Sequence, residues 1–228
     1  MGFPFGADQE AAHMVTWLEF NSMNGIKRLQ NILGKIDKKY PVSFPKPKHR
    51  QSLVEFNFGG ISTLFAGPTV IDFTILNLVN KKNKFIHVKN CSDQIYILGL
   101  ASNAVRQGCD ILISWPDDKG NFLSARFNSH NKYLSLIKTL PFKISSKDLL
   151  IQCYYSEESQ RKIEKSDNKT LGKKIKMFEQ ENKYLKKGID LDPADKVWKK
   201  LVKLGKRTFV PASEISRRLG AGAVDEKD

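Results

Sequence analysis

Arginine, serine and glycine residues gather in one segment near the end of the chain, residues 207–223, which reads RTFVPASEISRRLGAGA. Pro211 disfavours helix in the residues before it, so a short helix is expected to begin after Ser213. Backbone N–H groups at a helix start, together with hydroxyls and guanidiniums, suit an anion such as a carboxylate or a phosphate. The predicted ligand-binding residues are Arg207, Ser213, Ser216, Arg217, Gly220 and Gly222.

The use of arginine in this segment is informative. The chain contains 30 lysines and 8 arginines, yet three of the arginines lie in these seventeen residues. Arginine offers planar, bidentate hydrogen bonding that lysine lacks, so its choice favours an anion site. A structural alternative stays open, in which the segment caps the core and its arginines pair with surface acids. The glycines match neither a dinucleotide-binding fingerprint nor a P-loop.

Three carboxylates are candidates for proton transfer: Asp72, Glu214 and Glu10. Asp72 stands inside the apolar run 71–79, where a carboxylate must be paired, capping or functional. It is expected either to cap a turn after Gly67-Pro68 or to pair with an arginine of the C-terminal segment. His13 follows Glu10 on a predicted helix, as a partly exposed histidine or as an acid or base.

The same C-terminal segment resembles that of a bacterial family known only as a domain of unknown function. Members close with an R-T-Y-x-P-A-T-E-x-S-R-x-x-G-A-G pattern, which this chain carries as Arg207, Thr208, Phe209, Pro211, Ala212, Ser213, Glu214, Ser216, Arg217, Gly220, Ala221 and Gly222. Gly6–Ala11 and Trp17-Leu18 resemble the family's opening, and Asp72 and Ile111–Trp115 match more loosely. Members usually have a helix before that opening, and this sequence lacks it. A truncated chain or a misplaced start codon is expected to account for the difference. The resemblance implies no established activity.

Charge, hydropathy and cysteine content argue against several classes of partner for this protein. The net charge is +14, but the lysines are scattered and do not alternate with aromatic residues on a strand, so nucleic acid is not the expected partner. No run is long enough for a membrane span and no signal peptide is evident, so a cytoplasmic protein without a membrane partner is expected. Cys91, Cys109 and Cys153 are expected to be reduced and buried. No metal-binding spacing is present, and the sequence identifies no cofactor.

Helices are expected wherever apolar residues recur at helical spacing. The first two, Asp8–Phe20 and a helix from a cap at Asn24 to about Lys38, should form an αα-hairpin. Later helices are expected over Gln94–Gln107, capped by Ser92 or Asp93, over His130–Leu140, partly over Lys173–Lys186, and after an Asp192-Pro193 cap, where Val197, Trp198, Leu201 and Leu204 form the apolar side.

Strands are expected over Ile61–Phe65, Ile71–Val79, Phe85–Lys89, Cys109–Trp115, Asn121–Phe127 and Leu149–Tyr155. This order predicts an α+β or mixed α/β fold with a mixed sheet. Whether Phe85–Lys89 and Cys109–Trp115 pair stays open. One domain is expected, divided into a helical hairpin (1–40), a proline-rich basic connector (41–60), an α/β core (61–155), a lysine-rich excursion (156–190) and a C-terminal helix with its tail (191–228).

These features favour a cytosolic enzyme or enzyme-like protein of small-molecule metabolism that binds a carboxylate or phosphate. The alternative is a non-catalytic subunit whose C-terminal segment docks on a partner enzyme or on a second copy of the chain. A third hypothesis is nucleic-acid binding through net charge, which predicts retention on a nucleic-acid column that falls steeply with salt.

Overall fold

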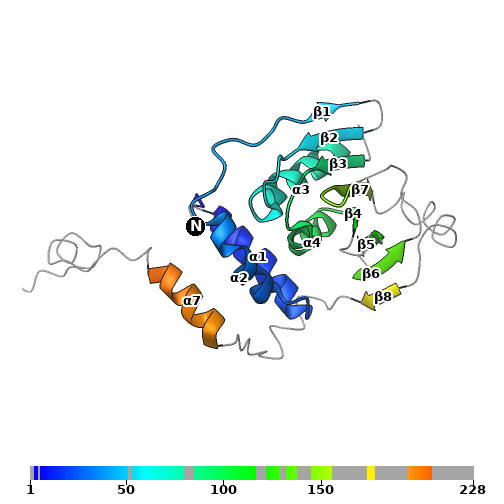
Figure 1. Cartoon of the computed structure of the whole chain (residues 1–228). Coiled ribbons are helices and arrows are strands. Elements are labelled where there is room, and N and C mark those ends of the chain that lie inside the picture. Colours follow the sequence, from blue (N-terminus) through cyan, green and yellow to red (C-terminus); the bar gives the residue numbers. More distant parts are fainter. Residues whose placement is uncertain are drawn as a thin grey trace, which may run out of the picture. The chain divides into compact units, whose positions relative to one another are not determined.

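Figure 1 shows the computed structural model of the chain. The structure describes residues 3–4, 6–50, 53–79, 85–116, 122–128, 132–137, 145–155, 174–177 and 195–206. The chain divides into two compact units, Met1–Leu191 and Asp192–Asp228. The expectation of a single domain stays a prediction.

The N-terminal helical hairpin is confirmed. Helix α1 spans Ala7–Phe20 and helix α2 spans Gly25–Ile36, and both bury the apolar stripes that the sequence predicts. The predicted side-chain cap at Asn24 is wrong, because Asn24 adopts a left-handed conformation and makes no capping bond. Glu19 of α1 replaces it: its Oε2 accepts the backbone N–H of Ile26 at 2.8 Å.

Eight strands of the described residues form one sheet in the order β1-β2-β3-β7-β4-β5-β6-β8. The strands are β1 (Lys48–His49), β2 (Leu53–Asn57), β3 (Phe85–Lys89), β4 (Cys109–Pro116), β5 (Phe122–Phe127), β6 (Lys132–Ile137), β7 (Leu149–Tyr155) and β8 (Lys174–Met177). Only β2 and β3 pair in parallel, so the predicted mixed sheet is confirmed. Strand β7 lies between β3 and β4, which therefore do not pair with each other.

Helix α3 (Thr63–Val79) replaces two predicted strands, Ile61–Phe65 and Ile71–Val79, and the turn expected at Gly67-Pro68 lies inside it. The helix is apolar on most of its surface, so its sequence shows no helical period. A short apolar run of this kind cannot be assigned from periodicity alone. The parallel pairing of β2 and β3 requires a crossover between them, and α3 supplies it.

The helix predicted over Gln94–Gln107 begins as a 3-10 helix, η1 (Gln94–Ile97), and continues as α4 (Leu98–Arg106). Asp93 precedes it with a φ of 57° and makes no side-chain cap bond, so that expected cap is wrong. Gly108 ends the segment with a φ of 77°, a conformation that glycine adopts without strain. Strands β4 and β5, which follow and were both expected, pair with each other in antiparallel orientation.

Two further helix predictions are wrong. The predicted helix His130–Leu140 contains strand β6, and the partial helix predicted over Lys173–Lys186 contains strand β8. Strand β6 pairs along its backbone with β5 and with β8, and this pairing with two neighbouring strands outweighs local helix preference.

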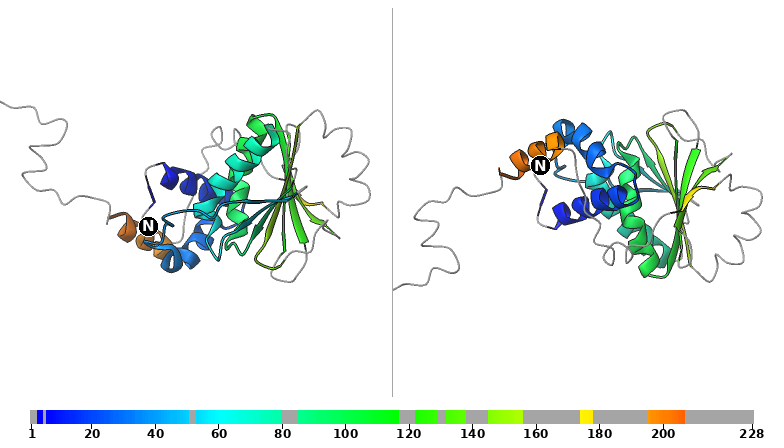
Figure 2. Two further views of the ribbon diagram at one scale, coloured as in Figure 1. Left: turned by 90° about the horizontal axis from the view of Figure 1, so that it is seen from above. Right: turned by 90° about the horizontal axis from the view of Figure 1, so that it is seen from below.

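The helices of the first unit lie on one face of the sheet. Figure 2 shows the sheet nearly edge-on, with α3 and α4 beside it and α1 and α2 farther out. The inner sheet face is apolar and joins the core through alternate residues such as Val54, Ile86, Ile113 and Ile151. No helix of the described ranges covers the outer face, which carries polar residues, including His87, Asp110, Ser114, Ser124 and Arg126.

Helix α7 (Asp195–Gly205) confirms the predicted C-terminal helix and belongs to the second unit. The expected Asp192-Pro193 cap lies outside the described residues. Within the described part of the chain, no helix combines the length and apolarity that crossing a bilayer requires.

The three cysteines are free and buried, as predicted. Burial raises the pKa of the Cys91 thiol to about 12. Cys109 and Cys153 share a hydrogen bond that lowers the pKa of Cys109 and raises that of Cys153. Because each thiol is buried, core packing accounts for all three.

Candidate functional site

The C-terminal part of the predicted site lies outside the described residues. This applies to the ligand-binding candidates Arg207, Ser213, Ser216, Arg217, Gly220 and Gly222 and to the proton-transfer candidate Glu214. Their roles stay predictions. The described part of the predicted site consists of Glu10 and Asp72.

Glu10 and Asp72, chosen separately from the sequence, lie within electrostatic reach of each other. Glu10 is in the first turn of α1, and Asp72 is on α3. Both carboxylates are exposed. Partial burial raises the pKa of Glu10, and the negative charge of Asp72 raises it further. Two like charges at close range disfavour double ionisation, so Glu10 holds a proton more readily than an isolated glutamate.

The structure corrects the expected setting of Asp72. Because α3 is a helix, Asp72 lies well inside it and cannot cap a turn after Gly67-Pro68. Its side chain is exposed, so it is not a carboxylate buried in an apolar strand. The alternative expectation, a partner arginine from the C-terminal segment, falls outside the described residues.

A tyrosine stands beside the carboxylate pair. Burial raises the pKa of Tyr40, and the charge of Glu10 raises it further. The Tyr40 ring is held by three phenylalanines, with centroid distances of 5.5 Å to Phe3, 5.3 Å to Phe65 and 5.9 Å to Phe44. The acidic pair therefore borders an aromatic cluster, which gives the site one apolar wall.

His13 lies one turn after Glu10 on α1. It is partly buried, and its Nε2 is buried with no hydrogen-bond partner in the described ranges. A buried imidazole nitrogen without a partner is uncommon, because the lost hydration is not replaced. His13 therefore stays an acid or base candidate beside Glu10.

A second polar cluster, which sequence reasoning missed, centres on Asp148. The His87 Nε2 lies 3.0 Å from Asp148 Oδ2, and both residues are buried, with 5% and 6% exposure. Ser145 donates its backbone N–H at 3.0 Å and its hydroxyl at 2.7 Å to the same carboxylate, and the backbone N–H of Asn90 donates at 3.2 Å. Burial alone would raise the pKa of Asp148, but these hydrogen bonds outweigh it and lower the pKa.

The second cluster continues along the outer face of the sheet. Glu55 lies directly opposite His87 in the β2–β3 register. It forms an ion pair with Lys89 at 2.7 Å and a longer one with Arg50 at 3.9 Å. The hydrogen bond from Lys89 lowers the pKa of Glu55, and the charges of Lys89, Arg50 and His87 lower it further. These contacts explain the cluster as a structural network that ties β3 to β2 and to the start of β7.

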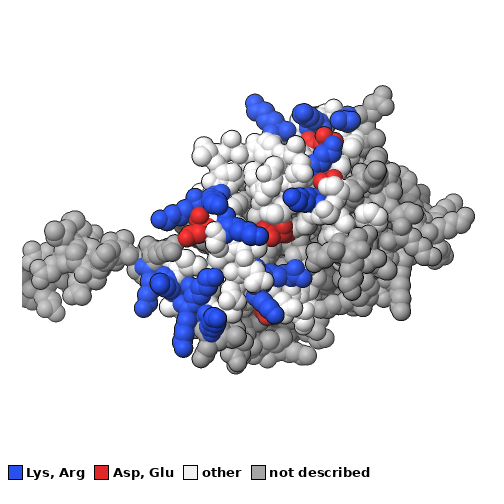
Figure 3. Space-filling model, in the orientation of Figure 1, with Lys and Arg blue, Asp and Glu red and all other residues white. Residues whose placement is uncertain are grey.

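No group of three or more potential metal ligands occurs among the residues that the structure describes. On the face drawn in Figure 3, the described lysines and arginines form several groups with acidic side chains between them. This distribution differs from the continuous basic stripe that characterises a nucleic-acid surface.

The fold resembles that of certain dehydrogenases. Malate dehydrogenase from Pyrococcus horikoshii OT3 matches with a TM-score of 0.55 and 12% identity, covering 93% of this chain and 91% of that chain. Sulfolactate dehydrogenase from Methanocaldococcus jannaschii matches with a TM-score of 0.53 and 12% identity, covering 90% and 92%. The chain spans 50% of the length of a matching dehydrogenase from Sinorhizobium meliloti. At these identities the likeness concerns the fold alone.

Residues 1–95 match the family described as Protein of unknown function (DUF3726). This confirms the resemblance to a family of unknown function over the first part of the chain, including Gly6–Ala11 and Trp17-Leu18. The match ends before the C-terminal pattern. Among curated proteins, none matches this sequence.

Proposed function

We infer that this chain binds a small carboxylate- or phosphate-bearing molecule, and that Glu10, beside Asp72, is a proton-transfer group of the first unit. One observation carries the proposal: two carboxylates far apart in the sequence interact on neighbouring helices, and one of them has a raised pKa. Such pairs are suited to general acid–base chemistry, because their environments separate the two proton affinities.

The roles of the two carboxylates follow from their electrostatics. Glu10 is the proton carrier, because both burial and Asp72 favour its protonated form. Asp72 is the neighbouring carboxylate whose negative charge adds to the effect of burial on the pKa of Glu10. Tyr40 and the phenylalanines around it provide an apolar wall that limits water beside the pair.

The anion is assigned to the C-terminal segment. Arg207 and Arg217 would hold the carboxylate or phosphate, assisted by Ser213, Ser216 and the backbone at Gly220 and Gly222, with Glu214 as a further proton-transfer candidate. The fold likeness supports the ligand class, since malate and sulfolactate, after which the two enzymes are named, both carry carboxylates.

The anion assignment predicts that Arg217→Ala abolishes ligand-induced thermal stabilisation. In a thermal-shift screen with malate, sulfolactate and inorganic phosphate, a bound anion at saturating concentration should raise the Tm of the wild type by about 5–10 °C. The Arg217→Ala protein should keep the wild-type Tm without ligand and show no increase with it.

Arg218→Ala is the matched control, because it removes the adjacent guanidinium and the same charge. It should retain the ligand-induced shift. If Arg217→Ala unfolds without any ligand present, the residue is structural, and a wild type that responds to none of the three anions contradicts the proposal.

The carboxylate pair predicts a specific change in titration. In Asp72→Asn, the pKa of Glu10 should fall toward its ordinary value, because the repelling charge is gone while partial burial remains. Side-chain NMR titration measures this directly. In Glu10→Gln, the pKa of Tyr40 should fall for the same reason. An unchanged Glu10 titration in Asp72→Asn would show that the two carboxylates act independently.

A further inference from the structure

Helix α7 separates its charged and apolar residues completely. At 3.6 residues per turn, the four lysines within α7 fall on one continuous arc of the helix surface, and a fifth lysine follows directly after its last residue. They are Lys196, Lys199, Lys200, Lys203 and Lys206. The apolar residues Val197, Trp198, Leu201, Val202 and Leu204 occupy the opposite arc.

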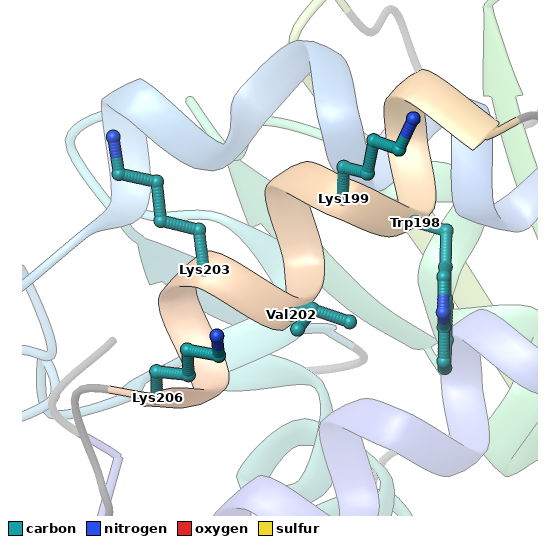
Figure 4. Close-up of a pocket in the computed structure, with 5 residues that line it drawn as sticks. All are labelled: Trp198, Lys199, Val202, Lys203 and Lys206. Carbon is teal, nitrogen blue, oxygen red and sulfur yellow. The ribbon is translucent and has the colours of Figure 1, made fainter.

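Part of the apolar arc faces solvent. Trp198 is 55% exposed and Val202, one turn later, is 38% exposed, whereas Val197, Leu201 and Leu204 are partly buried. Trp198 and Val202 line an open hollow of about 360 Å³ together with Lys199, Lys203 and Lys206. Figure 4 shows the two apolar side chains on one side of α7 and the Lys199 and Lys203 amines extending from the other. The hollow therefore follows the boundary between the two arcs.

We propose that α7 is a docking surface for an anionic phospholipid bilayer, on which it lies with Trp198 and Val202 inserted and its lysines at the headgroups. Charge complementarity carries the proposal: a cluster of lysines on an amphipathic helix is attracted to anionic headgroups. An indole at the border between charged and apolar surfaces suits the membrane interface, where one side of the ring is apolar and the other wet.

A lipid surface fits α7 better than an acidic protein does. The positive charges between Asp195 and Lys206 are all lysines, which act as flexible point charges, with no arginine to form bidentate carboxylate pairs. Only Trp198 and Val202 offer substantially exposed apolar surface on this helix. That area is small beside the roughly 800 Å² per partner of a stable protein interface. Among the described helices none is suited to span a bilayer, but that finding does not test a helix that lies on the membrane surface. This proposal therefore departs from the sequence-based expectation of no membrane partner.

The protein contains its own reporter for this interaction. It has three tryptophans, of which Trp17 and Trp115 are buried, at 2% and 5% exposure. Full-length protein is titrated with vesicles of phosphatidylcholine alone or with about 30% phosphatidylserine, an anionic lipid. We expect binding only to the anionic vesicles, a blue shift of the Trp198 emission that is absent in Trp198→Phe, and weaker binding as salt is raised.

Charge-reversal variants distinguish vesicle binding through α7 from adsorption through the net charge of the whole chain. Lys199→Glu combined with Lys203→Glu should weaken vesicle binding by about tenfold or more. Lys27→Glu combined with Lys35→Glu makes the same net change at exposed positions of α2 and should leave binding near the wild-type level. Val202→Asp, which keeps all five lysines, should also lose the blue shift.

Two outcomes would overturn the proposal. Equal losses in the two double variants would show diffuse adsorption through net charge. Absence of binding to anionic vesicles would exclude the lipid surface and leave an acidic protein as the partner to test. Both results are independent of the anion site assigned to the C-terminal segment, which the thermal-shift screen tests without vesicles.

Discussion

Replacing Gly25 with alanine should lower the free energy of unfolding by about 3 kcal/mol. Gly25 begins α2 where that helix meets α1. A β carbon there would overlap the carbonyl oxygen of Val15 and lie 2.9 Å from the amide nitrogen of Glu19. Both are backbone atoms of α1, so the clash is relieved only by moving the two helices apart. Urea denaturation followed by circular dichroism measures the loss.

Gly34→Ala, in the same helix, is the matched control. A β carbon at Gly34 would meet no atom within 4 Å. Alanine there should stabilise the protein by about 0.5–1 kcal/mol, because it reduces the backbone entropy of the unfolded chain without any contact to disturb. If both substitutions stabilise the protein, α1 and α2 do not pack as closely as the structure indicates.

Close packing around α1 extends to a second helix. A β carbon at Gly99 of α4 would lie 2.6 Å from the α carbon of Met14. Helix α1 is therefore approached by α2 at Gly25 and by α4 at Gly99. This arrangement fixes the position of Glu10, because the helix that carries it has little freedom to shift.

The helices that could be predicted from the sequence are those with one solvated face. Helices α1 and α2 keep a clear apolar stripe, so their existence and bounds follow from periodicity. Helix α3 lacks such a stripe because the core surrounds most of it, and apolar runs without a helical period are equally typical of buried strands. Strand β6 was missed because its strongest determinant is pairing with β5 and β8, which no local pattern contains.

The candidate site, too, could be predicted from the sequence only in part. Residue type and local context identified Glu10 and Asp72, but their proximity depends on α3 being a helix that packs near α1. The sequence placed His87 on a strand without identifying its partner Asp148. A signal was present: Ser145 and Asp148 have the three-residue spacing of a capping box, and the structure shows both bonds from Ser145 to that carboxylate.

Asp148→Ala should lower the free energy of unfolding at neutral pH by about 3–5 kcal/mol. Its carboxylate accepts hydrogen bonds from His87, Asn90 and Ser145, and all of them would lose their acceptor in or near the core. Asp72→Ala is the control, because Asp72 is exposed and should change stability by no more than about 0.5 kcal/mol. A loss below 1 kcal/mol in Asp148→Ala, roughly one ordinary hydrogen bond, would contradict this account.

The pH dependence of this effect has a definite sign. The pKa of Asp148 is lowered on folding, so its stabilisation is fully present above the unfolded-state pKa of about 4 and is lost as the pH falls below that value. The difference between wild type and Asp148→Ala should therefore shrink in acid and remain constant from pH 6 upward, about two units above that pKa. Because His87 shares the network, His87→Ala and Asp148→Ala should be non-additive when combined, and additivity would show that the 3.0 Å contact contributes no coupling energy.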